Sequence, residues 1–313
     1  MKFISAEHIE NTLDYPSLIE ALKNGFSSAS NVPLRAHHDY EVENKLDSTL
    51  LMMPAWNTSS LGVKLVTVSP ENGSLGLPSI NGLYVLFNKE TGEPKAFLDA
   101  KTLTNKRTAA TSALASSYLS RKDSKSLLMI GTGSLAPELI KAHATVRGIK
   151  EVFIWGRNSD KAEIVKSKIA SDFDLVTVVK ELNKSVFEKS DIVSCATLSS
   201  SPLFDGNLST KGQHFDLVGS YKKDFIEIDN QLISRSKIFV DTINALHESG
   251  DLKIPLEEGV IHQKDIKKDL FEMSLENRFQ RESDDEITVF KSVGYALEDL
   301  VAAELIMKED KNV

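Results

Sequence analysis

The chain of 313 residues contains one cysteine, no excess of positive charge and no long apolar run, and each absence argues against a class of protein. Because Cys195 is alone, an internal disulfide and a zinc cluster built on cysteines are excluded, and no metal site is predicted. The formal net charge of −8 argues against nucleic-acid binding, which needs a basic face. No segment approaches the roughly eighteen apolar residues of a membrane span, and residues 1–8 lack the apolar stretch of a signal peptide, so we expect a cytoplasmic protein.

A glycine-rich turn between two apolar runs is the most informative segment that is present. Residues 127–130 are apolar and are bounded by charge and glycine, which predicts a buried parallel strand. Residues 131–136, Gly-Thr-Gly-Ser-Leu-Ala, match the G-x-G-x-x-G/A pattern, and an amphipathic helix and a second strand at 151–155 follow. An ordinary tight turn is the alternative interpretation. The flanking strand, helix and strand favour a dinucleotide-binding βαβ unit.

Each glycine of this turn has a physical role in such a unit. Gly131 permits the tight turn, and Gly133 lets the backbone approach a pyrophosphate. Ala136 allows close packing of the helix, whose free N–H groups would face the phosphates. We therefore predict Gly131 and Gly133 as cofactor-binding residues.

The residues after the second strand indicate which dinucleotide is bound. An NAD-specific site usually carries an acid there to hold the ribose 2′-hydroxyl, whereas an arginine accommodates a 2′-phosphate. This chain has Arg157 and Asn158, no acid, and Lys161 one helical step further on. NADPH is therefore the preferred cofactor and NADH remains possible, unless Arg157 is only a solvated loop residue.

The order of predicted elements gives an α/β fold with two domains. Antiparallel strands are expected at 37–42, 49–54, 61–68, 80–88 and 95–98, a long helix at 99–119, and six parallel strands at 127–130, 151–155, 175–179, 191–195, 214–218 and 238–240. The second set predicts a Rossmann-type doubly wound parallel sheet. The domains are residues 121–289, which bind the dinucleotide, and residues 1–120 with about 290–313, an α+β domain completed by the C-terminal helix.

Several motifs in this order resemble the ornithine cyclodeaminase/mu-crystallin family. They are Gly-Val-Lys-Leu-Val at 62–66, Gly-Leu-Pro-Ser at 76–79, Leu-Thr-Asn-Lys-Arg-Thr-Ala-Ala at 103–110, the glycine turn, and Thr-Val-Phe-Lys-Ser-Val-Gly at 288–294. The resemblance covers residues 1 to about 307. It implies a homodimer built through the N-terminal domain, which binds the substrate, and an active site between the two domains.

The resemblance also implies roles for individual residues. Arg35, Lys64 and Arg107 match the cations that hold the substrate carboxylate, with Lys64 and Arg107 as catalytic residues and Val293 as a further substrate contact. Guanidinium groups suit a carboxylate, although solvated surface charge is the alternative for Arg35 and Lys64. The implied cofactor contacts, beyond those of the glycine turn and Arg157, are Ser79, Arg107, Ser134, Leu135, Asn158, Thr197, Val218, Ser220 and Ser292.

One departure from the family pattern decides between its activities. The cyclodeaminases carry an aspartate acid/base in a V-G-x-D segment, and here Tyr221 stands at that position, with Asp224 three residues further on. A tyrosine, with an ordinary pKa near 10, is a poor base at neutral pH. The chain therefore resembles the branch that reduces a small anionic cyclic imine, Δ1-pyrroline-2-carboxylate, to L-proline, and that extends to Δ1-piperideine-2-carboxylate. Ornithine cyclodeaminase, an alanine-type amino-acid dehydrogenase and a non-catalytic mu-crystallin-like binding protein are the alternatives.

Overall fold

The structure is a computed structural model that describes residues 2–309 and divides them into two compact units. Unit 1 comprises residues 2–108 and 295–309, and unit 2 comprises residues 109–294. The division falls within helix α3 (Ala100–Leu119), whereas the sequence placed the domain boundary at residue 120. Within residues 2–309, no helix has the length and apolar character needed to cross a membrane.

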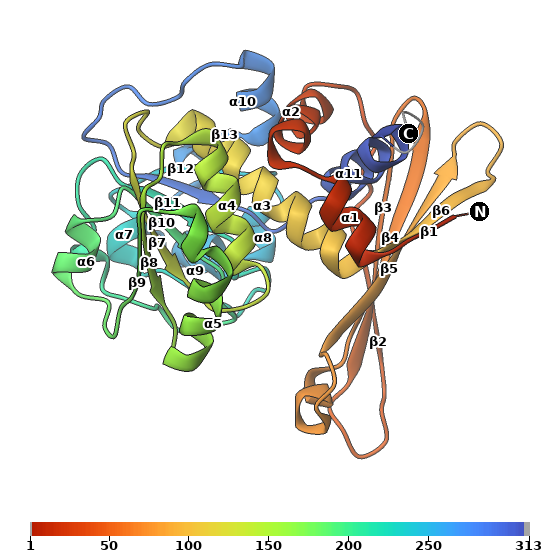
Figure 1. Cartoon of the computed structure of the whole chain (residues 1–313), viewed down its shortest axis with the longest axis horizontal. Coiled ribbons are helices and arrows are strands. Elements are labelled where there is room, and N and C mark those ends of the chain that lie inside the picture. Colours follow the sequence, from red (N-terminus) through yellow and green to blue (C-terminus); the bar gives the residue numbers. More distant parts are fainter. Residues whose placement is uncertain (1, 310–313) are drawn as a thin grey trace. The chain divides into compact units, whose positions relative to one another are not determined.

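Unit 1 is built on a six-stranded sheet with the order β1-β6-β5-β4-β3-β2 (Figure 1). Strand β1 pairs parallel to β6, and the other neighbours pair antiparallel. The strands are β1 (Lys2–Ile4), β2 (Ala36–Tyr40), β3 (Ser48–Trp56), β4 (Ser60–Val68), β5 (Ile80–Asn88) and β6 (Pro94–Asp99). The predicted antiparallel strands are thereby confirmed within a few residues, and β1 is an additional edge strand.

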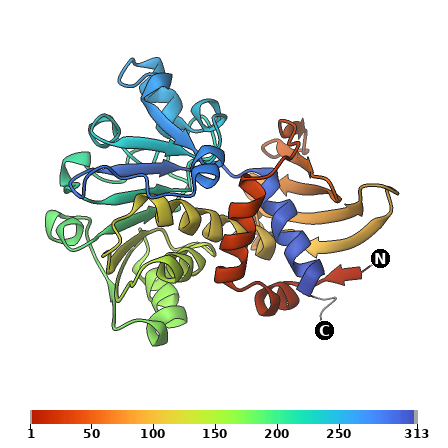
Figure 2. The same ribbon diagram turned by 90° about the horizontal axis from the view of Figure 1, so that it is seen from above.

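Helices cover one face of this sheet, and they include the C-terminal helix. The helices of unit 1 are α1 (Ala6–Thr12), α2 (Tyr15–Phe26), the first part of α3, and α11 (Ala296–Glu309). Helix α2 begins where the Asp14 side chain accepts the backbone N–H of Ser17, at 2.9 Å, and α11 lies alongside α2 and against β3, β4 and β5 (Figure 2). The predicted return of the C-terminal helix to the N-terminal strands is therefore confirmed.

The opposite face of the same sheet is apolar and only half-buried. Side chains alternate between the two faces of a strand, so the residues between the buried positions of β3, β4 and β5 lie on this outer face. Two of the rows that pair across the strands consist wholly of half-buried apolar side chains, Met52–Leu65–Leu83 and Trp56–Leu61–Phe87. We call these six residues the outer apolar face.

Unit 2 is built on an eight-stranded parallel sheet with the order β13-β12-β14-β11-β10-β7-β8-β9. Its strands are β7 (Ser126–Ile130), β8 (Glu151–Trp155), β9 (Leu175–Val178), β10 (Ile192–Cys195), β11 (His214–Leu217), β12 (Lys237–Val240), β13 (Ile266–Asp269) and β14 (Thr288–Lys291). Its helices are α4 (Ala136–Val146), α5 (Ser159–Ile169), α6 (Lys184–Glu188), α7 (Asn230–Ile233), α8 (Ala245–Glu248), α9 (Gly250–Glu257) and α10 (Leu270–Glu276). Helices α4 and α5 contact β7, β8 and β9, whereas α6, α7, α8 and α9 contribute to an apolar cluster with alternate residues of β7, β10 and β11.

The sequence predicted six parallel strands, and the sheet of unit 2 has eight. The six predicted strands are present, but β14 is inserted between β11 and β12, and β13 adds an edge. Strand β14 begins and ends with buried polar residues, Thr288 and Lys291, so only Val289 and Phe290 within it are apolar. Strand β13 is the polar segment Ile-Lys-Lys-Asp, which suits a sheet edge.

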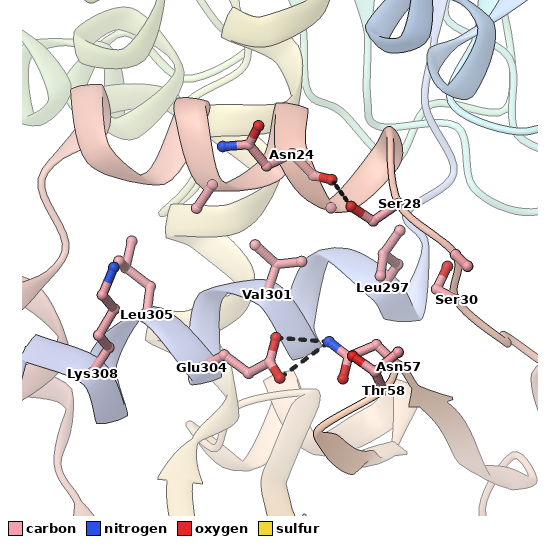
Figure 3. A pocket seen from close by; sticks show the side chains of 13 residues that line it. Asn24, Ser28, Ser30, Asn57, Thr58, Leu297, Val301, Glu304, Leu305 and Lys308 are labelled. Atoms are coloured by element: carbon pink, nitrogen blue, oxygen red, sulfur yellow. Dashed lines mark hydrogen bonds between the residues drawn. The ribbon is translucent and has the colours of Figure 1, made fainter.

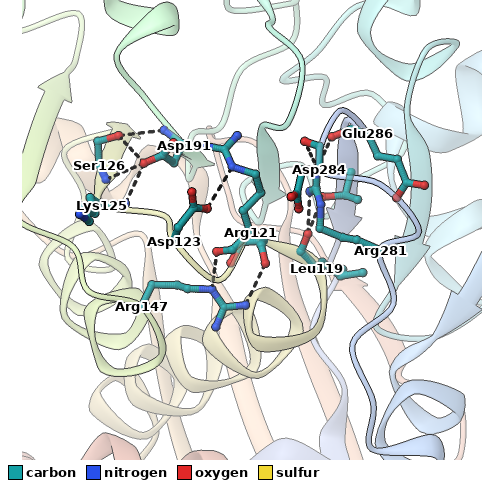
Figure 4. A network of polar contacts seen from close by, with 12 residues as sticks. Leu119, Arg121, Asp123, Lys125, Ser126, Arg147, Asp191, Arg281, Asp284 and Glu286 are labelled. Atoms are coloured by element: carbon teal, nitrogen blue, oxygen red, sulfur yellow. Dashed lines mark hydrogen bonds and ion pairs between the residues drawn. The ribbon is translucent and has the colours of Figure 1, made fainter.

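The charged segment 121–125 belongs to unit 2 because its groups are bound there. Asp191 accepts hydrogen bonds from the backbone N–H groups of Lys125 and Ser126, at 2.7 and 3.1 Å, and pairs with Arg121 (Figure 4). Arg147 donates to the carbonyl group of Ser116 in the last turn of α3, at 3.0 Å, and to those of Ser120 and Arg121 just after the helix, at 2.9 and 2.8 Å. These bonds attach the last turns of α3 to the parallel sheet, which explains why the division lies inside the helix.

Candidate active site

Two predicted substrate-binding cations of unit 1 meet two buried carboxylates. Lys64 lies on β4 and Arg107 on α3, and both side chains are almost fully buried. Lys64 Nζ is 2.8 Å from Asp299 Oδ2, and Arg107 Nε donates to Asp299 Oδ1 at 3.0 Å. Arg107 Nη1 also donates to Glu298 Oε2, at 2.5 Å. We call Lys64, Arg107, Glu298 and Asp299 the ion cluster.

Local structure explains why α11 presents both acids. The helix starts at Ala296, and Glu298 Oε1 accepts the backbone N–H of Tyr295 at 3.1 Å, as a carboxylate in a first turn commonly does. Asp299 is the next residue, and its two oxygens contact one cation each. Sequence reasoning missed both acids because acids at the start of a helix are ordinarily assigned to capping.

The environment of the cluster lowers the pKa of Lys64 and raises that of Arg107. Burial, and then the neighbouring Arg107, lower the pKa of Lys64 to about 8, although Asp299 and Glu298 act in the other direction. Burial also disfavours the charge of Arg107, but Asp299 and Glu298 outweigh it and raise the pKa of the guanidinium above its usual value. Lys64 is therefore the member of the pair that can exchange a proton near neutral pH.

Two other residues predicted in unit 1 lie outside the ion cluster. Arg35 immediately precedes β2, and Ser79 immediately precedes β5; both are half-buried. The Ser79 carbonyl accepts the backbone N–H of Ser69 at 2.8 Å, which ties the two ends of the connection between β4 and β5. Their roles in binding substrate and cofactor stay predictions.

A separate groove of about 530 Å³ lies in unit 1 between α2 and α11 (Figure 3). Glu304 and Lys308 of α11 line it together with Asn57, whose Nδ2 donates to Glu304 Oε2 at 2.9 Å. None of the predicted substrate or cofactor residues lines this groove.

The predicted cofactor residues of unit 2 lie along one edge of its sheet. Since neighbouring strands are parallel, their carboxyl ends share this edge, and ligands of open α/β sheets bind there. Gly131, Gly133, Ser134 and Leu135 follow β7, Arg157 and Asn158 follow β8, Thr197 follows β10, Val218 and Ser220 follow β11, and Ser292 with the substrate candidate Val293 follows β14. We call this edge the cofactor edge.

The turn between β7 and α4 fits the pyrophosphate of a dinucleotide. Gly131 has a φ of 132°, and a Cβ there would meet the carbonyl oxygen of Ala196 at 2.6 Å. A Cβ on Gly133 would meet nothing within 4 Å, so the backbone at Gly133 is open to a ligand. Helix α4 has no side-chain cap at its start, as expected where a phosphate would accept its N–H groups.

The loop after β8 is exposed and contains the two predicted discriminating residues. Arg157 is exposed in it. The Asn158 side chain accepts the backbone N–H of Lys161 at 3.0 Å and caps α5, so it already has a structural role. Arg157 is therefore the better candidate for a 2′-phosphate contact.

Buried carboxylates that the sequence did not single out hold the other loops of this edge. Asp241 Oδ2 accepts the backbone N–H groups of Val293 and Gly294, both at 2.8 Å, and the hydroxyl of Ser292 at 3.1 Å. Glu227 binds the loops after β10 and β11 in a similar way. Each acid directly follows an apolar residue in sequence. Both side chains are fully buried, and no spacing motif in the sequence indicates that burial.

The position that departs from the family pattern carries an aromatic side chain. Tyr221 is half-buried, and its ring packs edge-on against Phe225 with centroids 6.3 Å apart. Asp224 is exposed.

Known proteins are similar to this chain along its whole length. The model of the Ornithine cyclodeaminase/mu-crystallin family matches residues 1–312. The Delta(1)-pyrroline-2-carboxylate reductase of Colwellia psychrerythraea is 40% identical over 317 residues, which cover 99% of each chain. The solved Delta(1)-pyrroline-2-carboxylate reductase of Thermococcus litoralis, in complex with NADH and L-proline, has a TM-score of 0.92 at 33% identity and covers 100% of this chain and 98% of that one. An archaeal alanine dehydrogenase dimer with bound NAD has a TM-score of 0.90 at 27% identity, with 100% and 97% covered.

Proposed function

Because the chain belongs to the ornithine cyclodeaminase/mu-crystallin family, we propose that it reduces cyclic ketimine acids, with Δ1-pyrroline-2-carboxylate converted to L-proline. The observation that carries the proposal is the full-length likeness to two reductases of that name, one of them solved with NADH and L-proline. Reduction of Δ1-piperideine-2-carboxylate to L-pipecolate is the extension to a six-membered ring. A cytoplasmic location stays a prediction.

The chemistry requires little beyond positioning of the substrate. A bound reduced nicotinamide would supply a hydride to the imine carbon, and a proton from the protein or from water completes the amine. Lys64 and Arg107 are the proposed catalytic residues, and with Arg35 they are the proposed contacts of the substrate carboxylate. The pKa of Lys64, lowered by burial to about 8, suits a group that carries charge at neutral pH and can release a proton to the ring nitrogen.

Within unit 1, the ion cluster supports this assignment. A buried lysine and a buried arginine held by carboxylates are fixed in position, and preorganised cations bind a carboxylate with little further loss of side-chain freedom. A protein that served only as a scaffold would gain little from burying four charged groups, since such clusters seldom add stability.

We propose NADPH as the preferred cofactor, with NADH also accepted. Arg157 is exposed after β8, and no acid stands beside it to hold a ribose 2′-hydroxyl. The Thermococcus litoralis relative was solved with NADH, so both cofactors belong in the assay.

We also propose a homodimer formed through unit 1. The outer apolar face consists of two rows of half-buried side chains on β3, β4 and β5, and a second copy would remove them from water. The archaeal alanine dehydrogenase that this chain resembles is a dimer.

The test is oxidation of NADPH and of NADH by the purified protein with a panel of substrates. Δ1-pyrroline-2-carboxylate and Δ1-piperideine-2-carboxylate are compared with pyruvate plus ammonia, because the likeness to alanine dehydrogenase makes that activity the second candidate. L-ornithine is included and its release of ammonia is measured. Turnover of the ketimines at a much higher kcat/KM than pyruvate supports the proposal. Turnover of pyruvate alone, or of no substrate, contradicts it.

A further inference from the structure

One buried carboxylate joins two loops of the cofactor edge. Glu227 Oε1 accepts the backbone N–H of Thr197 at 2.7 Å and its hydroxyl at 2.9 Å. Glu227 Oε2 accepts the backbone N–H groups of Gly219 and Ser220, at 2.8 and 3.3 Å. Thr197 belongs to the loop after β10, and Gly219 and Ser220 to the loop after β11, so this side chain sets the spacing between the two loops.

The backbones of the two loops also approach each other so closely that no side chain fits between them at Gly219. A Cβ on Gly219 would lie 2.0 Å from the Thr197 carbonyl oxygen and 2.2 Å from its nitrogen. The backbone N–H groups of Thr197 and Gly219 therefore lie close together, and buried N–H groups need an acceptor. Glu227 accepts from both.

Glu227 is itself held by a second carboxylate. Asp251 Oδ1 accepts the backbone N–H groups of Glu227 and Ile228, at 2.7 and 3.2 Å, and Lys291 Nζ lies 3.2 Å from Asp251 Oδ2. All three ionisable side chains, Glu227, Asp251 and Lys291, are buried. Polar contacts thus connect Lys291 on β14 with Asp251 on α9, and Asp251 with Glu227, which holds the two loops. Glu227 therefore has little freedom to move away from its donors.

We infer that Glu227 is a positioning residue for the dinucleotide, whose ionised carboxylate holds the loops after β10 and β11 in the conformation that binds the cofactor. The inference rests on the proposed function, because it takes Thr197 and Ser220 as cofactor contacts. Glu227 itself uses both oxygens on the protein and is not assigned a contact with the cofactor.

The ionised state is essential to this role. Each oxygen of Glu227 faces a backbone N–H group. A protonated carboxyl, or the amide of a glutamine, keeps one acceptor oxygen but directs a donor at the N–H group on the other side. The charged or titratable groups that face it are Lys291 on β14, Asp251 on α9 and Cys195 on β10. Burial raises the pKa of Glu227 to about 7, with Lys291 lowering it and Asp251 raising it. The bonds on one of the two sides, to Thr197 or to Gly219, are therefore lost progressively as the pH falls below about 7, and the carboxyl no longer joins the two loops.

The test compares Glu227→Gln with Asp191→Asn in the full chain. Asp191 is the matched control, because it also accepts two backbone N–H groups and a hydroxyl, but at the amino ends of the strands. NADH is the probe, since it lacks a 2′-phosphate that would titrate in the same range, and its binding is followed by nicotinamide fluorescence. Amide hydrogen exchange of the protein without cofactor provides a second readout at residues 197, 219 and 220.

We expect Glu227→Gln to raise the Kd for NADH by about tenfold to a hundredfold and to speed exchange at those amides, while Asp191→Asn leaves both near wild type. The wild-type Kd should rise as the pH is lowered from about 8 to about 6, and the Kd of Glu227→Gln should not. A folded Glu227→Gln protein that binds NADH like wild type would overturn the inference. If that variant does not fold, an unchanged wild-type Kd across the same pH range would overturn it. Wild-type protein that binds neither NADH nor NADPH would instead refute the proposed function, and the inference with it.

Discussion

The Lys64 ammonium lies 2.8 Å from the Asp299 carboxylate, and the two side chains are only 3% and 0% exposed. The proposed substrate clamp is therefore already paired before a substrate carboxylate arrives. Asp299 and Glu298 raise the pKa of Lys64 while burial and Arg107 lower it, so the charge of this lysine depends on the whole ion cluster.

Substrate binding should weaken as the pH rises through about 8. Lys64 has its pKa lowered to about 8, so it is charged below that pH and loses its charge above it. The inhibition constant of furan-2-carboxylate, a ring acid without a titratable nitrogen, should rise by up to about tenfold between about pH 8 and about pH 9. In Asp299→Asn the inhibition constant should begin to rise at a lower pH, because Asp299 raises the pKa of Lys64.

Glu304→Gln is the control for that experiment. Glu304 lies on the same helix, but it bonds Asn57 at the groove, whereas the carboxylates with the largest effect on the pKa of Lys64 are Asp299 and Glu298. The pH dependence of the inhibition constant could shift equally in Glu304→Gln, or be absent in the wild type. Either result would remove Lys64 from the carboxylate site.

Loss of Arg107 should destabilise the fold as well as the reaction. Arg107→Met removes the guanidinium that pairs with the buried Glu298 and Asp299, and breaking a buried pair costs about 3–5 kcal/mol. Denaturant unfolding should show this loss, and Arg107→Met combined with Glu298→Gln should recover part of it. Arg278→Met, at a pair whose arginine is 70% exposed, should change the free energy of unfolding by less than about 1 kcal/mol. Equal stability of the two single variants would show that the ion cluster contributes nothing.

Residues close together in sequence were predictable, whereas residues joined only by the fold were not. The turn at Gly131 and Gly133 was recognised because its strand, turn and helix are consecutive. Arg107 and Asp299 are 192 positions apart, and nothing local in either segment indicates their pairing. Glu227 was missed for a similar reason, since its donors at Thr197 lie 30 residues away.

The extra strand of unit 2 shows a second limit of sequence patterns. Strand β14 is central in the sheet, yet Thr288 and Lys291 at its ends are polar. Both have partners that are distant in sequence: the Thr288 hydroxyl donates to the Leu119 carbonyl at 3.1 Å, and Lys291 Nζ lies 3.2 Å from Asp251 Oδ2. Only Val289 and Phe290 of this strand are apolar, and two residues are too short a run for hydrophobic periodicity to identify a strand.

Arg157 should determine the preference between the two cofactors. We expect wild-type protein to use NADPH with a higher kcat/KM than NADH, because the exposed guanidinium can bind a 2′-phosphate. Arg157→Asp should reverse or flatten that ratio by repelling the phosphate and offering an acceptor to the ribose. Lys184→Asp, at a lysine at the start of α6, is the charge-matched control and should leave the ratio unchanged. An unaltered ratio in Arg157→Asp would show that the 2′-phosphate is bound elsewhere.

The outer apolar face should be the dimer contact. Leu65 lies in the centre of one apolar row, between Met52 and Leu83, so Leu65→Glu would place a charge where the second copy packs. We expect a dimer for the wild type at micromolar concentration and a monomer for this variant, measured by sedimentation. Ile164→Glu changes a side chain that is 56% exposed on α5 of unit 2 and should leave the dimer intact. A monomeric wild type would contradict the proposed assembly.

Tyr221 distinguishes ketimine reduction from ornithine cyclisation. Release of ammonia from ornithine needs a base, and a tyrosine would need its pKa lowered by about three units to act as one near neutral pH. Its ring packs against Phe225, and Asp224 is exposed, while the buried Glu227 has both oxygens occupied by backbone donors. The wild type should therefore release no measurable ammonia from L-ornithine while it oxidises NADPH with Δ1-pyrroline-2-carboxylate. Tyr221→Phe should keep ketimine reduction within about tenfold of wild type, since a lost proton donor would cost about a hundredfold or more. Ornithine deamination by the wild type that disappears in Tyr221→Phe would reassign the protein to the cyclodeaminases.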